Sequence, residues 1–511
     1  MTATDPRPTD NSRPATGSRR WLLLATVGFG LLLITLDNSV LYTALPTLTA
    51  ELDASASQSL WIINAYPLVI AGLLLGSGAL GDRIGHRTMF LGGLVVFGLA
   101  SLAAAFAPTA GALIAARAFL AVGAAAMMPA TLALVRLGFD DVRERNFAIA
   151  VWGSISLIGF AIGPIIGGLL LEHFWWGSVF LVNVPIVVLA LVVTPFVAPR
   201  APRDSSRSFD VLSSVLALAM LSGAVLAIKE AFHQPQAWGT VGAAAVVAVV
   251  AGVLFVRRQR SLADPLLDFS VFRNRAFSAG VLAAVTAMFA IGGVQLLTTQ
   301  RFQLVAGYTP LEAGLLVTAI AVGSLPSGLL GGLLLHRLGL RVLVSGGLAV
   351  AGLGIVVSIM GTEMGLAIFV VGLVLTGLGL GASMSVASTA ILGNAPPRRA
   401  GMAASVEEVS YEFGGLIAVA VLGSLSSLLY AARVVLPDGA PVAAGESIGE
   451  AREVADVVPG LMEAASAAFD EAYLVILSVV AFALVVAATA AALLLRHHGP
   501  GTAASSFEGN E

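Results

Sequence analysis

The sequence of 511 residues lacks cysteine altogether, contains a single lysine, and has only 11% charged residues. Without cysteine the chain cannot form a disulfide, a thiolate nucleophile or a cysteine-based metal site. Because the lone lysine, Lys229, follows Ile228, the chain has no GxxxxGK(S/T) phosphate loop, and an ATPase that drove it would have to be a separate subunit. HExxH, the common signature of zinc proteases, is absent as well. These absences argue against an enzyme.

Apolar residues dominate the sequence: 58% of the residues are hydrophobic and the mean hydropathy is +0.93. A helix of about 20 apolar residues crosses a bilayer core about 30 Å thick. Apolar stretches of this kind recur from Trp21 almost to Arg496. The net charge of -3 creates no global field that would attract nucleic acid. The sequence therefore predicts an all-α polytopic membrane protein.

The apolar stretches between charged, proline and glycine breaks predict fourteen spans. They lie at 21–45, 60–81, 88–108, 110–135, 146–170, 178–198, 210–230, 238–256, 277–299, 310–335, 339–360, 363–392, 401–430 and 472–495. Residues 1–20 are rich in Pro, Thr, Ser and Arg, so we expect a disordered tail there rather than a cleaved signal. Residues 500–511 are expected to form a second tail.

The distribution of basic residues predicts the orientation. If the N-terminus is cytoplasmic, 22 of the 27 Lys and Arg residues lie on the inside, Arg117 lies within the membrane, and four lie outside: Lys229, Arg301, Arg433 and Arg452. The positive-inside rule then places both termini in the cytoplasm. The long outer segment 431–471 carries eight acidic residues against two arginines. It is either a solvated loop or a flap that attracts or releases cations at the outer mouth.

An internal repeat divides the chain. Gly78, Arg83, Gly85 and Arg87 recur at a constant offset of 254 as Gly332, Arg337, Gly339 and Arg341, whereas Asp82 is replaced by His336. Duplicated halves are a common plan of transporters, with the substrate site near the midplane where the halves meet. We therefore expect a six-helix N-terminal half at 21–200 and a six-helix C-terminal half at 261–499. The two spans within 201–260 would lie outside this six-plus-six core.

Several motifs follow one another in a set order. They are Leu36–Pro46, Trp61 with Tyr66, Gly78–Arg87, Leu113–Gly123, Gly159–Gly168, and Trp176 with Phe180–Pro185. In this order and on these spans they resemble the fourteen-span drug:proton antiporter family of the major facilitator superfamily, and Gly159–Gly168 resembles the segment regarded as the antiporter signature. The sequence departs from the family pattern at Tyr42, His86, Leu120 and Ala121.

The resemblance implies two six-helix bundles with two extra central transmembrane helices. It also implies a multi-pass protein of the bacterial inner (cytoplasmic) membrane that works without a cofactor and uses protons as the coupling ion. Its partners would be lipophilic cationic small molecules, protons and membrane lipids, and it would act as a monomer. Arginine outnumbers lysine 26 to 1, which favours a GC-rich bacterial genome.

An ionised side chain at the centre of a membrane helix raises the free energy of insertion by about 2.5–3.5 kcal/mol, so each one is a candidate functional residue. Asp37 lies about sixteen residues, roughly 24 Å, into the first span. Arg117 lies roughly 9 Å below the outer surface in the fourth span, which is a similar depth. Because the family places these spans side by side, we expect the two to interact directly or through water. Asp37 would couple protons and contribute to substrate binding; the alternative is a fixed ion pair that only holds two helices together. Arg117 would either transfer protons or act as a plain helix-to-helix donor.

Three carboxylates lie in the thirteenth span. Glu408 and Glu412 are four residues apart and share one helix face, whereas Glu407 is rotated by about 100°. Family placement of this helix beside the cavity makes all three candidate cation ligands, with Glu408 and Glu412 also coupling protons. The alternative is that Glu407 faces loop water. The tenth span has no acid between Glu312 and His336, so we expect monocations to be handled better than dications.

Two further groups of residues complete the candidate site. The aromatic residues expected to face a bound cation are Trp61, Tyr66, Trp152 and Tyr411. The residues expected to control switching are Gly78, Asp82, Arg83, Gly85, Arg87, Gly159, Gly163, Pro164 and Gly167. In this interpretation the charged residues close one conformation, Gly78 and Gly85 allow the tight turn, and the glycine face of the fifth span packs against the other half. Packing without a switching role is the alternative for that face.

These observations predict an exporter that exchanges protons for lipophilic cations, such as dyes, quaternary ammonium antiseptics and fluoroquinolones, by alternating access. Three alternatives remain at this point. A dedicated exporter of one antibiotic or metabolite would share every motif. A membrane sensor on a transporter scaffold would need no proton relay. A nutrient symporter is disfavoured by Gly159–Gly168 and by an acidic, apolar cavity.

Overall fold

The computed structural model describes residues 17–139, 141–199, 210–232, 237–262, 265–395 and 399–498, and all regular structure in this part of the chain is helical. A helix satisfies its own backbone N–H and C=O groups, which is what a lipid environment without water requires. Twelve helical stretches of the described residues are long and apolar enough to cross a membrane. The prediction of an all-α polytopic membrane protein is confirmed.

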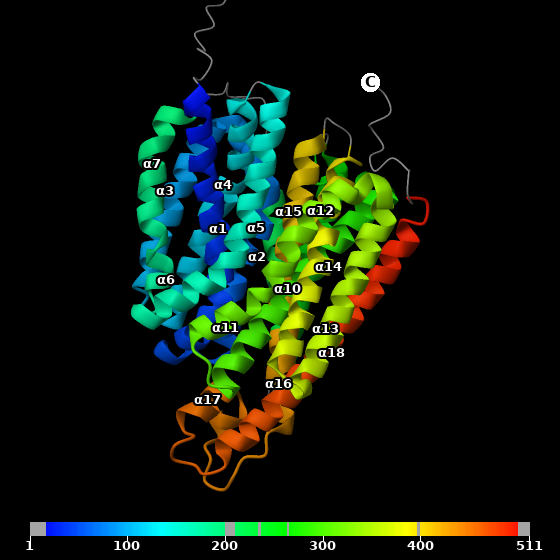
Figure 1. The fold of residues 1–511 in the computed structure, drawn as a ribbon. Coiled ribbons are helices and arrows are strands. Elements are labelled where there is room, and N and C mark those ends of the chain that lie inside the picture. Colours follow the sequence, from blue (N-terminus) through cyan, green and yellow to red (C-terminus); the bar gives the residue numbers. More distant parts are fainter. Residues whose placement is uncertain are drawn as a thin grey trace, which may run out of the picture.

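The first helices pack into one bundle, which we call the N-terminal bundle (left in Figure 1). Its elements are α1 (Gly17–Glu51), α2 (Ala56–Ile84), α3 (His86–Ala105), α4 (Ala110–Gly138), α5 (Val142–His173), the short α6 (Ser178–Leu181) and α7 (Asn183–Val197).

A second bundle, the C-terminal bundle, lies beside it (right in Figure 1). Its elements are η1 (Phe269–Arg273), α10 (Arg275–Gln300), η2 (Arg301–Val305), α11 (Pro310–Val317), α12 (Ala319–Arg341), η3 (Val342–Gly346), α13 (Gly347–Met364), α14 (Leu366–Leu392), α15 (Ala400–Ile417), η5 (Ala418–Gly423), α16 (Ser424–Arg433), η6 (Val442–Gly445), α17 (Ile448–Glu453) and α18 (Leu461–Leu494).

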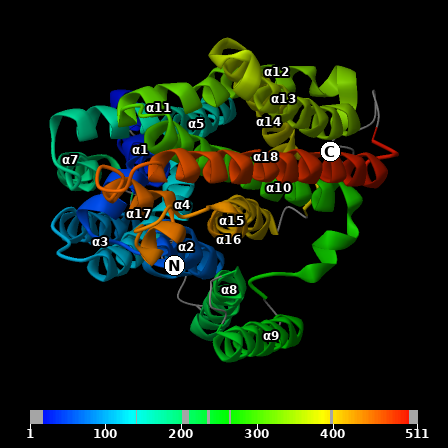
Figure 2. The same cartoon turned by 90° about the horizontal axis from the view of Figure 1, so that it is seen from below.

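Two further helices, α8 (Val211–Phe232) and α9 (Trp238–Ser261), lie outside both bundles. Figure 2 shows α8 beside α2 and α16, with α9 farther out. Arg258 of α9 donates two hydrogen bonds of 2.9 and 3.0 Å to Asp210, the residue before α8, and Gln259 donates to the Ser213 hydroxyl at 2.6 Å. These bonds hold the two helices together at one end. We call α8 and α9 the peripheral pair.

The two ends of the molecule differ. α1 begins beside the start of α5, where Arg20 donates to Glu144, and residues just after α18 reach the turn near Arg341, whose N–H donates to the His498 carbonyl. We call this end, at the top of Figure 1, the tail end. η6 and α17 lie at the opposite end, which we call the loop end.

The internal repeat predicted from the sequence has a structural counterpart. Gly85 joins α2 to α3 with φ 91°, and Gly339, 254 residues later, interrupts α12 with φ 77°. The positive φ values explain why glycine stands at both turns. The expectation that Gly78 also allows the turn is wrong, because Gly78 lies inside α2 and is not among the residues with positive φ. Gly339 also divides the 55-residue apolar stretch Pro310–Met364.

The bundles bond to each other toward the loop end. Thr299 of α10 donates a hydrogen bond of 2.9 Å to the Tyr42 carbonyl, and Gln303 of η2 donates one of the same length to the Thr43 carbonyl. Both acceptors lie in the second half of α1, beyond Asp37. The two halves are therefore held together on the loop side of Asp37.

We predict that Gly85→Ala lowers stability by about 1 kcal/mol or more, because a Cβ is disfavoured at that backbone conformation. Thermal unfolding of the purified protein in detergent measures the change. Gly78→Ala is the matched control, since a Cβ added at Gly78 meets nothing within 4 Å and the position is helical. Equal unfolding temperatures for both variants would contradict the assignment of the turn to Gly85.

Candidate functional site

A buried ion pair lies in the N-terminal bundle. The Arg117 guanidinium of α4 donates to the Asp37 carboxylate of α1, as the similar depths of the two residues predicted. Asp37 is 2% exposed and Arg117 is completely buried. Asn183 of α7 donates to the other carboxylate oxygen at 3.0 Å, so three helices meet at Asp37.

The rest of the Arg117 side chain is also enclosed. Its Nε donates to the Ile62 carbonyl at 3.2 Å, and its guanidinium carbon lies 4.5 Å from the centre of the Tyr66 ring. The Arg117 Nη2 has no hydrogen-bond partner among the described residues. Because a buried charge is stable only when paired and hydrogen-bonded, the pair fixes α1, α2 and α4 relative to one another. One guanidinium donor remains available.

Asn183 lies in the segment Phe180–Pro185, and the sequence alone assigned it no role. In the structure its amide bridges Asp37 and the Ser101 hydroxyl, the latter at 3.3 Å. Asn183 is completely buried. An amide within the otherwise apolar helix α7 was the signal that could have singled it out.

The three carboxylates of α15 differ in their surroundings. Glu407 is 8% exposed, accepts a hydrogen bond of 3.2 Å from the Tyr411 hydroxyl, and is hydrogen-bonded to Ser388. Glu408 and Glu412 are only partly buried. The alternative that Glu407 faces loop water does not hold, since that side chain is tied into the packing of α14 and α15. Glu408 and Glu412 occupy the less enclosed face.

Glu412 links the two bundles electrostatically. Its carboxylate interacts through space with Arg117, Tyr66 and Tyr42, all of the N-terminal bundle. The Tyr42 hydroxyl lies 3.3 Å from the point where a Cβ on Gly292 of α10 would stand. Tyr42, one of the four residues that depart from the family pattern, therefore reaches across to the other bundle. Arg117 is within range of two carboxylates, Asp37 by contact and Glu412 through space.

The four aromatic side chains expected to face a bound cation already have partners inside the protein. Tyr66 packs against the Arg117 guanidinium, and the Trp61 ring centre lies 4.5 Å from the Lys229 ammonium. The Trp152 indole donates to the Thr131 hydroxyl at 3.1 Å, and Tyr411 donates to Glu407. A cation of the protein itself thus lies on one ring face of Tyr66 and of Trp61. The hydrogen bonds of Trp152 and Tyr411 engage only their polar atoms, so contact of these rings with a bound cation stays a prediction. Spacing along the sequence could not show that Lys229 reaches Trp61.

The glycine face of α5 packs differently from the expectation. A Cβ at Gly159 would lie 2.0 Å from the Thr35 hydroxyl and one at Gly163 would lie 1.8 Å from the Ser39 hydroxyl, while Gly167 faces Val40. All three partners belong to α1 of the same bundle, so the expected contact with the other half is wrong for these glycines.

The contact of α5 with the other bundle lies on a neighbouring face of the helix, about 100° away. It is made by Gly168, which lies against Leu311, and by the Pro164 carbonyl, which lies against Gly314. Successive residues of one helix face different neighbours, and the sequence alone did not identify which neighbour each face meets.

The residues expected to form ion pairs near Gly85 are partly described. Arg87 donates to the carbonyls of Pro195 at 2.9 Å and Ala198 at 3.5 Å, at the end of α7, where a cation is favoured by the helix dipole. Arg83 is exposed. The side chain of Asp82 lies outside the described residues.

A cavity of about 600 Å³ opens at the loop end between the two bundles. Carboxylates line it from both sides, Glu51 and Asp53 from the end of α1 and Glu450 and Glu453 from α17. Burial, followed by the nearby charges of Glu453, Glu446 and Asp53, raises the pKa of Glu450. The acidic segment 431–471 thus contributes helix α17 to the cover of this cavity.

We predict that Asp37→Asn destabilises the protein by about 3–5 kcal/mol, because it leaves a buried guanidinium without its counter-charge. Arg117→Met should cost less, since an unpaired carboxylate can be neutralised by a proton whereas a guanidinium stays charged. The double variant should recover part of the loss. Thermal unfolding in one detergent measures all three; costs that simply add would contradict a direct interaction.

The raised pKa of Glu450 predicts a pH effect on α17. Above the ordinary carboxyl pKa of 4.5 the folded segment holds a proton more readily than the free one, so packing of the segment weakens as the pH rises. At pH 8, Glu450→Gln should therefore slow maleimide labelling of Thr47→Cys, inside the cavity, by about twofold.

The difference should shrink as the pH falls, because protonation removes the charge of the native carboxyl. Glu363→Gln, at the exposed end of α13, is the control. Faster labelling in Glu450→Gln would show that the charge holds the segment down.

Comparisons with known proteins agree with this arrangement. A profile of the Major Facilitator Superfamily matches residues 27–304, and one of sugar (and other) transporters matches residues 276–431. The multidrug efflux pump LfrA of Mycolicibacterium smegmatis is 38% identical over 490 residues, covering 93% of this chain and 97% of LfrA. The methyl viologen resistance protein SmvA of Salmonella typhimurium is 37% identical over 472 residues, covering 90% and 95%.

The fold is also found in a solved structure. A bacterial homolog of the human lysosomal transporter Spinster, in an inward-facing and occupied conformation, matches with a TM-score of 0.67 at 14% identity, covering 94% of this chain and 98% of that one. This likeness shows the fold. Together with the family profile and the relatives above, it establishes that the chain belongs to the Major Facilitator Superfamily and is a membrane transporter, not an enzyme.

Proposed function

We propose that this transporter exports lipophilic, mainly monocationic toxic compounds in exchange for protons, by alternating access between the two bundles. The observation that carries the proposal is the position of Arg117, which contacts Asp37 and lies in the field of Glu412 of the other bundle. The names of the relatives LfrA and SmvA, a multidrug efflux pump and a methyl viologen resistance protein, support the export of toxic cations. The preference for monocations rests instead on the absence of an acid between Glu312 and His336 in the tenth span.

The chemistry follows from the two carboxylates that share one guanidinium. A proton on Asp37 removes its charge and weakens its hold on Arg117, which favours an approach of Arg117 toward Glu412 and so changes the relation of the bundles. A cation that binds near Glu408 and Glu412 competes with both the proton and Arg117 for these carboxylates. If the proton and the substrate cation cannot occupy these carboxylates together, binding of one releases the other, which is the basis of exchange. Glu407, bound to Tyr411 and Ser388, would orient this helix face.

The membrane arrangement completes the proposal. Counting α5 as a span and Pro310–Met364 as two adds two spans to the twelve, which gives fourteen, with the peripheral pair outside a six-plus-six core. From the positive-inside rule we infer that the tail end faces the cytoplasm, with the protein in a bacterial inner membrane. Because the bundles bond to each other on the loop side of Asp37, the substrate would reach the site from the cytoplasm in this conformation.

A dedicated exporter of a single antibiotic or metabolite is the alternative within transport. It would use the same ion pair and the same carboxylates, so the two possibilities differ only in the breadth of substrates. A panel of dyes, quaternary ammonium compounds and fluoroquinolones distinguishes them.

Energised inverted vesicles containing this protein should accumulate ethidium, and a protonophore should abolish the uptake. We expect Asp37→Asn and Glu412→Gln to reduce uptake by about tenfold or more, since each removes a charge of the exchange site. Glu363→Gln should transport like the parent protein. Transport of tetraphenylphosphonium should exceed that of methyl viologen, a dication.

Three results would count against the proposal. Uptake that survives the protonophore would exclude proton coupling. Parent-like uptake in both carboxylate variants would exclude Asp37 and Glu412 from it, and no cation uptake by the parent protein would move the dedicated exporter ahead.

A further inference from the structure

The peripheral pair covers a seam between the two bundles. Leu221 and Val225 of α8 pack in one apolar cluster with Leu68 of α2 and with Leu416 and Ala420 of the C-terminal bundle. Figure 2 shows α8 in this position, with α9 on its far side. When the bundles move relative to each other, α8 must either follow one of them or break contact with both.

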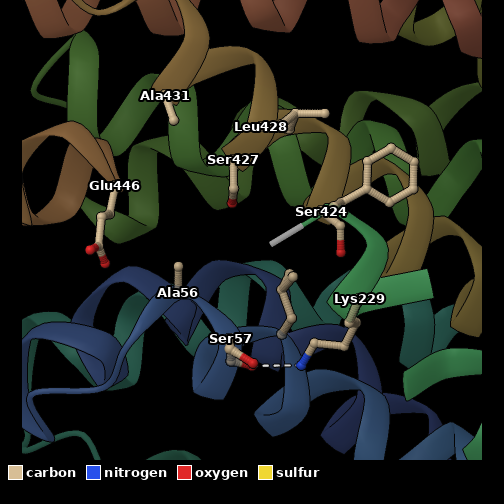
Figure 3. A pocket seen from close by; sticks show the side chains of 10 residues that line it. Ala56, Ser57, Lys229, Ser424, Ser427, Leu428, Ala431 and Glu446 are labelled. Carbon is tan, nitrogen blue, oxygen red and sulfur yellow. Dashed lines mark hydrogen bonds between the residues drawn. The ribbon is translucent and has the colours of Figure 1, made fainter. Parts of the chain in front are cut away.

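Polar contacts tie α8 to α2. The Lys229 ammonium donates a hydrogen bond of 2.7 Å to the Ser57 carbonyl, shown in Figure 3, and lies 4.5 Å from the centre of the Trp61 ring. Lys229 is the only lysine of the chain and is 4% exposed. Because burying an ammonium is costly without an acceptor or an aromatic face, this pairing is specific and holds the end of α8 nearest the loop end.

Close packing joins the same two helices farther along. A Cβ at Gly72 of α2 would lie 2.9 Å from the Leu218 Cβ and 3.1 Å from its Cα. The backbones of α2 and α8 therefore approach each other more closely than a larger residue at position 72 would permit. The contact of α8 with the N-terminal bundle is both polar and tight.

The contact of α8 with the C-terminal bundle differs from this, since it is made by apolar side chains. Among the described residues no hydrogen bond or ion pair joins α8 to α15, η5 or α16. Nearer the loop end, a cavity of about 70 Å³ lies between α8 and α16, with Lys229 and Phe232 on one side and Ser424 and Leu428 on the other. Figure 3 shows this cavity. The Ser424 hydroxyl is buried and has no partner in the described part of the chain. Apolar side chains and a void offer little resistance to sliding.

We propose that Lys229 fixes the peripheral pair to the N-terminal bundle, so that the pair moves with this bundle and slides over α15 and α16 during transport. Lys229 is thus a positioning residue that does not touch the substrate. The inference rests on the proposed alternating access and assigns the two extra helices to one moving body.

Spin-label distances test this assignment directly, and the absence of native cysteine makes labelling specific. Cysteines replace Leu137 of α4, Leu212 of α8 and Leu338 of α12, three exposed side chains at the tail end, in pairs. Distances are measured in nanodiscs at pH 8 and pH 5.5, with and without tetraphenylphosphonium. We expect the 137–338 distance to change, the 212–338 distance to change with it, and the 137–212 distance to stay constant.

The outcomes separate the inference from the proposed function. One result overturns the inference: the 137–338 and 137–212 distances change while the 212–338 distance stays constant. The bundles would then move, but the peripheral pair would belong to the C-terminal bundle. If 137–338 does not change, alternating access itself fails and the inference falls with it.

Variants of Lys229 test the anchor. Lys229→Met should broaden the 137–212 distribution and lower the maximal ethidium transport rate by about threefold while leaving its apparent KM unchanged. Lys229→Arg, which keeps a donor and a cation on Trp61, should restore both. Glu363→Gln, at the exposed end of α13 and away from Lys229, is the control. A 137–212 distribution in Lys229→Met as narrow as in the parent would show that Lys229 is not the anchor.

Discussion

The pairing of Arg117 with Asp37 in an apolar interior is the interaction on which the rest of the molecule depends. A guanidinium cannot lose its proton there, so Arg117 of α4 must be given partners: the Asp37 carboxylate of α1, and the Ile62 carbonyl and Tyr66 ring of α2. Asn183 of α7 in turn donates to Asp37. The requirement fixes the helices of the N-terminal bundle. It also leaves Arg117 able to respond to Glu412, the charge that approaches from the other bundle.

Glycine provides the second constraint, because the helices must approach closely enough for short side chains to meet. Gly159 and Gly163 bring α5 against Thr35 and Ser39 of α1, and Gly168 brings it against Leu311 of the other bundle. One helix therefore contacts its own bundle on one face and the other bundle on the next. A transporter built in this way can keep each bundle rigid and allow movement only at the seams.

Much of this arrangement could be predicted from the sequence. Hydropathy predicted the helices, and the offset of 254 predicted the turns at Gly85 and Gly339. Depth along two spans, together with the neighbouring placement of these spans that the family resemblance implies, predicted the contact of Asp37 with Arg117. Which neighbouring helix each face of a helix contacts could not be predicted, because the sequence pattern shows which residues share a face but not what that face packs against. For that reason the partners of Gly159, the occupied ring of Trp61 and the role of Asn183 emerged only from the structure.

The central claim is that a proton and a lipophilic cation exclude each other at carboxylates connected through Arg117. Proton release measured with a pH-sensitive dye, when tetraphenylphosphonium is added to the purified protein in weak buffer, tests this claim most directly. The parent protein should release protons when the cation binds, and Asp37→Asn should release clearly fewer. Binding of the cation to the parent protein with no release of protons would contradict it.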